Sequence, residues 1–314
     1  MGISKEMKVP TIDFCSPELK PGTPQWESIK TQVFQALQEY GIFEAAYDKV
    51  PREAIFEISK EIFEFPVGTK LKTKSKTPNL HGYLGQFPLL PLYESLGIFD
   101  VFKPESVESI SKVFWPDGHP NFYNVLKTYS KPLVELDEMV KTMVLESLGL
   151  EKYIDELLDS CIFNMRLTHY QATKFEDGKK PGLTVHTDPG FLTLISQNDV
   201  NGLEVLTKKG EWIDVNIAPN SLIVISGDSF MAWTNGRLHS PVHRVTLTEN
   251  VERFSIPLFA FPRPGHIIEA RKELVDEENP LVFKPFEIMG LYEFVKTEAG
   301  AKTGSNAFKA YCGI

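Results

Sequence analysis

The hydrophobic periodicity of this chain changes near Cys161, and that change limits the folds open to it. Before Cys161, apolar residues recur at three- and four-residue spacing over 26–37, 51–65 and 120–148, which predicts amphipathic helices. After it, short apolar or alternating runs are separated by turn residues such as Asn201-Gly202, which predicts antiparallel strands. We therefore expect a mainly β fold with flanking α structure: a double-stranded β-helix (jelly roll, cupin-like) core supported by N-terminal helices.

We expect a single domain over residues 1–314, made of three consecutive regions. Residues 1–160 form a helix-rich region, 161–270 form the jelly-roll core, and 271–314 form a C-terminal segment. Residues 80–102 are rich in Gly, Pro and aromatic side chains, which predicts an extended loop with short strands that suits a binding surface. The strands expected in the core are 162–170, 191–195, 203–206, 222–226, 242–245 and 254–261.

Charge and cysteine content narrow the classes of partner. A formal net charge of -9 argues against nucleic acid, because proteins that bind phosphate backbones carry clustered positive charge. The three cysteines are too few and too scattered for a disulfide framework, which fits a reducing compartment. No stretch approaches the ~20 apolar residues of a membrane helix, and the first residues lack the apolar core of a signal peptide. We expect a cytoplasmic protein that acts on a small molecule and has no membrane partner.

His186 and Asp188, with the distant His243, have the residue types of a metal site. In a strand, residues two apart project to one face, so His186 and Asp188 can reach one ion while Thr187 points away. His243 must then arrive from a separate strand. Two imidazoles and one carboxylate form the facial triad typical of non-haem Fe(II) oxygenases. The tripeptide alone is weak evidence, because a chain with 7 His and 42 acidic residues can contain it by chance.

Arg253 and Ser255 strengthen this interpretation. They lie on the next expected strand after His243, again two residues apart and therefore on one face. A guanidinium and a hydroxyl in this arrangement can bind a dicarboxylate, the guanidinium through two parallel hydrogen bonds. The metal triad and the anion site thus explain one another.

The order and spacing of these motifs resemble those of plant Fe(II)- and 2-oxoglutarate-dependent dioxygenases, and the similarity extends over nearly the whole chain. Residues 80–100 and 231–245 look most like the branch that contains the AOP-like enzymes, which modify glucosinolate side chains, and the steroidal glycoalkaloid hydroxylases. Further matches to the family are Val9-Pro10-Thr11-Ile12-Asp13, Tyr40-Gly41-Ile42-Phe43, Gly202-Leu203-Glu204-Val205, Trp212-Ile213-Asp214-Val215, Pro219-Asn220-Ser221, Gly227-Asp228, Asn235-Gly236-Arg237 and His243-Arg244-Val245.

The resemblance implies a set of cofactors and roles. Iron is held by His186, Asp188 and His243, and 2-oxoglutarate chelates it through its keto oxygen and C1 carboxylate. The far carboxylate lies against Arg253, Ser255 and Tyr170, dioxygen takes the last position, and ascorbate is the expected reductant. Thr168 departs from the asparagine that is usual in the family. Because Asp188 fills the carboxylate position that related halogenases vacate, halogenation is disfavoured.

The expected reaction is hydroxylation of a small plant specialised metabolite, with decarboxylation of 2-oxoglutarate to succinate. Desaturation, ring closure and O-dealkylation stay open, because the outcome depends on which substrate hydrogen faces the oxidant. The family also suggests a monomer. Candidates for the substrate pocket are Phe191, Phe259, Tyr83 and Trp233, although aromatic residues more often fill a core.

Two functions of other classes remain. One is a jelly-roll protein that binds a small ligand without catalysis, and the other is a zinc hydrolase, since two His and one carboxylate also bind zinc. The Arg253-x-Ser255 pair has no evident role in a zinc hydrolase. A binding protein would not need the metal triad and the anion pair together, which are His186, Asp188, His243, Arg253 and Ser255.

Overall fold

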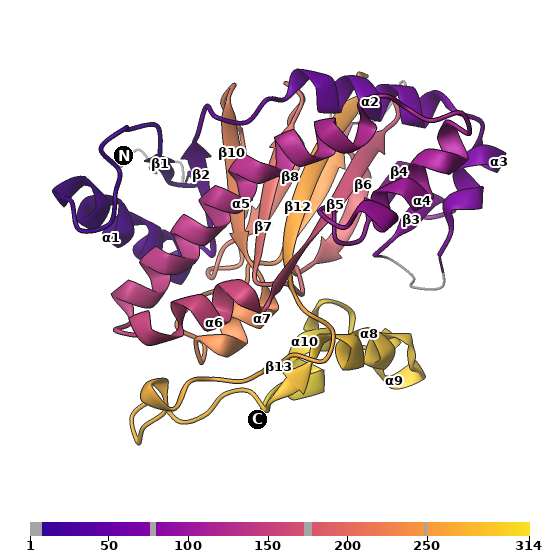
Figure 1. The fold of residues 1–314 in the computed structure, drawn as a ribbon. Coiled ribbons are helices and arrows are strands. Elements are labelled where there is room, and N and C mark those ends of the chain that lie inside the picture. Colours follow the sequence, from indigo (N-terminus) through magenta and orange to yellow (C-terminus); the bar gives the residue numbers. More distant parts are fainter. Residues whose placement is uncertain (1–7, 76–79, 173–177, 248–249) are drawn as a thin grey trace, which may run out of the picture.

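Two β-sheets form the centre of the computed structural model, which describes residues 8–75, 80–172, 178–247 and 250–314 (Figure 1). The first seven residues, on which the expectation of no leader sequence rests, lie outside this range. The larger sheet contains, from edge to edge, β1 (Thr11–Asp13), β2 (Ile42–Ala46), β10 (Ser221–Ser226), β7 (Leu192–Gln197), β12 (Arg253–Pro262), β5 (Cys161–Tyr170), β4 (Leu90–Ile98) and β3 (Gly82–Phe87). The smaller contains β6 (Lys180–His186), β11 (His243–Leu247), β8 (Leu203–Leu206) and β9 (Trp212–Asp214).

Each face of the larger sheet buries its own apolar cluster, because successive side chains of a strand point to opposite faces. In β10, Leu222 and Val224 pack with the helices, whereas Ile223 and Ile225 pack with apolar residues of the smaller sheet. The second cluster therefore lies between the two sheets. This arrangement confirms the expected jelly roll.

Helices cover the outer face of the larger sheet. Figure 1 shows α5 (Phe122–Ser147) running across the strands, with α1 (Pro24–Glu39) and α2 (Glu53–Glu64) beside it. Thr23 caps α1 by accepting from the Trp26 N–H at 3.2 Å, and the Trp26 indole N–H donates to Glu146 of α5 at 2.7 Å. Tyr129 of α5 donates to the carbonyl of Ile256 in β12 at 3.1 Å, so the helix layer is tied directly to the sheet.

The expectation that 80–102 is mainly an extended loop with short strands is wrong, because most of this region is strand. This region forms the hairpin of β3 and β4, and β4 pairs with β5 from Tyr93 opposite Tyr170 to Ile98 opposite Met165. Gly97 allows the close approach of the chain here, since a Cβ at this position would lie 2.7 Å from the Leu80 carbonyl oxygen. β-structure is therefore not confined to 161–270, because four strands of the larger sheet come from the first hundred residues.

Several short elements complete the described chain. In Figure 1 the C-terminal helices α8–α10 lie together near one end of the strands. No helix in the described residues is long and apolar enough to cross a membrane. The remaining helices and strands are α3 (Val67–Lys70), α4 (Pro104–Phe114), α6 (Ile154–Asp159), α7 (Asp228–Trp233), α8 (Ile288–Lys296), α9 (Glu298–Ala301), α10 (Ala307–Cys312), β13 (Ile267–Ile268) and β14 (Phe286–Glu287).

A buried polar cluster joins α3 to the β3–β4–β5 edge of the larger sheet. Glu94 accepts hydrogen bonds from Lys70 at 2.7 Å and from the Tyr83 hydroxyl at 2.8 Å, and it lies 2.9 Å from His169 Nδ1. Burial alone would raise the pKa of Glu94, but the bonds from His169, Lys70 and Tyr83 lower it to about 2. The carboxylate is therefore ionised and fully paired.

We expect Glu94→Gln to lower the free energy of unfolding by about 3 kcal/mol at neutral pH, because the buried Lys70 then loses its counter-ion. Since the pKa of Glu94 lies below its ordinary value of 4.5, this contribution is present above pH 4.5 and is lost as the pH falls toward 2. Urea denaturation at several pH values measures both effects. The control is Glu108→Gln, which breaks an exposed ion pair with Lys112 and should cost less than ~0.5 kcal/mol. Equal losses in the two variants would contradict the role assigned to Glu94.

Candidate metal centre

His186 and His243 come together as a cross-strand pair. His186 is the last residue of β6, His243 is the first residue of β11, and the two lie opposite one another in the antiparallel register. Their ring centroids are 4.2 Å apart. The expectation that His186 and Asp188 share the face of one strand is wrong, because β6 ends at His186. Asp188 lies in the following turn, where its carbonyl accepts from the Asp228 N–H at 2.7 Å.

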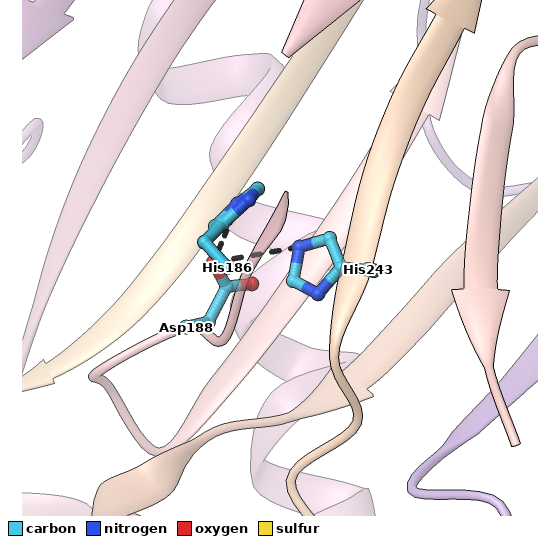
Figure 2. Close-up of side chains that lie close together, drawn as sticks. All are labelled: His186, Asp188 and His243. Atoms are coloured by element: carbon cyan, nitrogen blue, oxygen red, sulfur yellow. Dashed lines mark ion pairs between the residues drawn. The ribbon is translucent and has the colours of Figure 1, made fainter. Parts of the chain in front are cut away.

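The three side chains converge despite this difference (Figure 2). Asp188 Oδ1 lies 3.7 Å from His186 Nε2 and 3.7 Å from His243 Nε2. One ligand atom from each residue falls within 4.8 Å of the others. Such a cluster of two imidazoles and one carboxylate is the donor set that holds Fe(II) by one face and leaves its other positions open.

The second nitrogen of each imidazole and the second oxygen of Asp188 form hydrogen bonds within the protein. His186 Nδ1 lies 2.7 Å from the Thr184 carbonyl and His243 Nδ1 lies 3.1 Å from the Pro241 carbonyl, so each Nδ1 donates its proton. The Thr193 hydroxyl donates to Asp188 Oδ2 at 2.7 Å. Loss of hydration and the neighbouring His243 lower the pKa of His186 to about 4. His186 is thus neutral near pH 7, and Nε2 of both rings faces the Asp188 carboxylate, as metal binding requires.

Arg253 lies in a cavity with the three candidate ligands, and none of the described residues compensates its charge. Its guanidinium donates to Gln197 Oε1 at 2.8 Å and to Ser255 Oγ at 3.2 Å, and its centre lies 4.9 Å from the centre of the Tyr170 ring. Only 2% of Arg253 is exposed, and its Nε has no hydrogen-bond partner among the described residues. Nor does any carboxylate of the described chain pair with it. A buried cation with unused donors fits an external carboxylate such as the far end of 2-oxoglutarate.

The structure brings most of the predicted site residues to one cavity. Its walls include His186, Asp188 and His243 together with Arg253, Ser255, Tyr170 and Phe259. Burial raises the pKa of Tyr170 to about 12, although Arg253 opposes the shift, so its hydroxyl stays protonated.

Three of the four aromatic candidates are not brought to this cavity. Phe191 packs against Phe230 in the helix-side core, with ring centroids 6.2 Å apart. Trp233 lies in α7 with its ring 6.2 Å from that of Tyr153, and the Tyr83 hydroxyl binds Glu94. Being aromatic does not determine which face of the sheet a side chain takes.

Sequence reasoning missed Thr193, Tyr93 and Arg166, which line the cavity, and Gln197, which accepts a hydrogen bond from Arg253. Gln197 lies opposite Ser255 in the register, so the alternation along β7 and β12 was the available signal. Tyr93 was hidden because its strand was interpreted as a loop. Thr193 and Arg166 carry no local motif.

The comparisons with known proteins agree with this geometry. The family model of the 2OG-Fe(II) oxygenase superfamily matches residues 159–262, which include His186, Asp188 and His243. The Arabidopsis thaliana protein named "Probable 2-oxoglutarate-dependent dioxygenase AOP1.2" is 42% identical over 98% of this chain and 98% of its own. This chain belongs to the Fe(II)- and 2-oxoglutarate-dependent dioxygenases. It is an oxidoreductase of the AOP-like branch that uses iron, 2-oxoglutarate and dioxygen.

Solved structures extend the likeness to the fold of this dioxygenase. The rice dioxygenase for auxin oxidation is 29% identical with a TM-score of 0.81, covering 97% of this chain and 100% of its own. The Arabidopsis thaliana dioxygenase for auxin oxidation 1, in its complex with 2-oxoglutarate, is 25% identical with a TM-score of 0.75, covering 87% and 99%. Family membership favours the oxygenase over the zinc hydrolase and the non-catalytic binder.

We expect Arg253→Leu to raise the KM for 2-oxoglutarate about 30-fold or more, because a buried charge pair with the far carboxylate is lost. The wild-type dioxygenase should also prefer 2-oxoglutarate to 2-oxopentanoate, which has the same chain length without that carboxylate, and the variant should lose this preference. Release of succinate from 2-oxoglutarate and of butyrate from 2-oxopentanoate measures the KM and the preference. A variant that keeps the preference would show that Arg253 does not bind the far carboxylate.

Proposed function

We propose that this dioxygenase hydroxylates a small plant specialised metabolite and holds its iron through His186, Asp188 and His243. The observation that carries the proposal is the convergence of three ligand atoms in one cavity with Arg253, which is buried and has no counter-charge among the described residues. Neither feature alone selects this chemistry. Together they provide an ion site and an anchor for the keto-diacid that the ion activates.

Each side chain has a role that follows from its contacts. Bound iron, with 2-oxoglutarate and dioxygen, supplies the oxidation that is coupled to decarboxylation to succinate. Arg253, Ser255 and Tyr170 orient the cosubstrate through its far carboxylate. The Thr184 and Pro241 carbonyls hold the two imidazoles in one tautomer, so that Nε2 of each ring binds the ion.

We propose that the substrate approaches from the side of the C-terminal helices. A second cavity of about 160 Å³ lies there, with His186 on one wall and Leu291, Tyr292, Val295 and Phe308 on the other. His186 lines both cavities, so a molecule in the second one lies beside the metal centre. Apart from His186, Thr187, Asp228 and the Tyr292 hydroxyl, the lining is apolar, which suits a small substrate with a largely apolar body. The C-terminal segment therefore contributes to the proposed pocket.

Purified enzyme with Fe(II), ascorbate and 2-oxoglutarate should release succinate slowly even without substrate. We expect His186→Ala and Asp188→Ala to abolish this release, because each removes one of three ligands. Glu108→Gln, at an exposed ion pair, is the matched control and should keep the wild-type rate. Wild-type turnover in both ligand variants would mean that the metal site lies elsewhere.

The reaction outcome is tested by an untargeted metabolite screen with detection of mass shifts. A product that has gained one oxygen atom supports hydroxylation, whereas loss of two hydrogens or of an alkyl group indicates desaturation, ring closure or O-dealkylation. The cytoplasmic location and the monomeric state remain predictions; fractionation and light scattering test them.

A further inference from the structure

Asp228 links the two segments that carry the candidate metal ligands, although it is not one of the three residues that converge on the ion position. It is the first residue of α7, and 3% of it is exposed. Its Oδ2 accepts from the Thr187 hydroxyl at 2.8 Å, and its Oδ1 accepts from the Ser240 hydroxyl at 2.7 Å. Thr187 lies between His186 and Asp188, and Ser240 lies three residues before His243. One carboxylate thus bridges both segments.

The backbone reinforces the same connection. The Asp228 N–H donates to the Asp188 carbonyl at 2.7 Å, and the Gly227 N–H donates to the Phe191 carbonyl at 2.9 Å. A Cβ at position 227 would lie 2.3 Å from the Gly190 carbonyl oxygen and 2.8 Å from that of Asp188. Only glycine permits this approach. The start of α7 is therefore packed directly against the turn that carries Asp188.

The chemistry of Asp228 is costly for a residue that serves stability alone. A buried carboxylate gains most from a cation, yet no Lys, Arg or His of the described chain pairs with Asp228, whose side-chain partners are two hydroxyls. An apolar side chain would fill the same space at lower cost in desolvation. Buried polar groups that cost stability in this way occur where function requires a defined geometry.

We infer that Asp228 is a positioning residue that holds the His186–Asp188 turn and the 240–243 segment at the separation one metal ion requires. This inference rests on the ligand assignment proposed above. Ligand groups must be held within about 0.5 Å of their productive positions, and groups behind the ligands affect metal affinity about 10- to 100-fold. Thr187 and Ser240 act through Asp228, since each contributes one of its two side-chain hydrogen bonds.

The test measures Mn(II) affinity by electron paramagnetic resonance of the free ion, so that no turnover is required. We expect Thr187→Val, Ser240→Ala and Asp228→Ala each to weaken Mn(II) binding about 10-fold or more. Thr187→Ser, which keeps the hydroxyl, should restore wild-type affinity. Once Asp228 is removed, adding Thr187→Val should have no further effect, because both act through one group. In the metal-free protein, amide hydrogen exchange over 187–191 should be faster in Thr187→Val than in the wild type.

Two controls separate the possible failures. Glu94→Gln should lower stability while keeping wild-type Mn(II) affinity, which distinguishes positioning from a general loss of stability. If Thr187→Val and Ser240→Ala bind Mn(II) as the wild type does while His186→Ala does not, the role of Asp228 is wrong and the ligand assignment stands. If His186→Ala also retains affinity, the ligand assignment itself fails, and the inference fails with it. If Asp228→Ala does not fold, Thr187→Val and Ser240→Ala alone test the inference.

Discussion

The site depends on the pairing of β6 with β11, which sets His186 directly opposite His243. Side chains alternate along a strand, so a slip of one residue would turn one imidazole to the other face and destroy the site. The register shifts between His243 and Val245, so the pairing is irregular directly beside the histidine. Such irregularities commonly re-aim side chains next to active sites. With both rings placed, Asp188 needs only to reach them from the turn after β6.

The distribution of buried charge separates structural groups from functional ones. Lys70–Glu94 and Lys141–Asp137 are buried pairs in which the chain supplies its own counter-charge. Arg253 has only neutral partners in the described chain, which is costly unless a ligand completes the site. This difference supports the proposal that an anion completes the site. On that proposal, the stability lost by burying Arg253 without a counter-charge is the cost of a binding site for a carboxylate.

Much of this organisation was predictable because it follows from local patterns. Short apolar or alternating runs between turn residues located β5, β7, β10 and β12, and residue types alone suggested the metal triad. Other features depend on tertiary contacts. β6 ends before Asp188 because the turn bonds to α7, and β4 continues through a Gly- and Pro-rich stretch because β5 offers it a partner. Tyr83 and Trp233 could not be assigned, since an aromatic side chain suits a core as well as a cavity wall.

The most direct measurement is a crystal structure of the protein with Mn(II) and 2-oxoglutarate, in which anomalous scattering locates the ion. The account predicts one ion within coordination distance of His186 Nε2, His243 Nε2 and Asp188 Oδ1. It also predicts the far carboxylate of the keto-diacid against Arg253. An ion bound elsewhere, or a keto-diacid whose far carboxylate points away from the guanidinium, would contradict it.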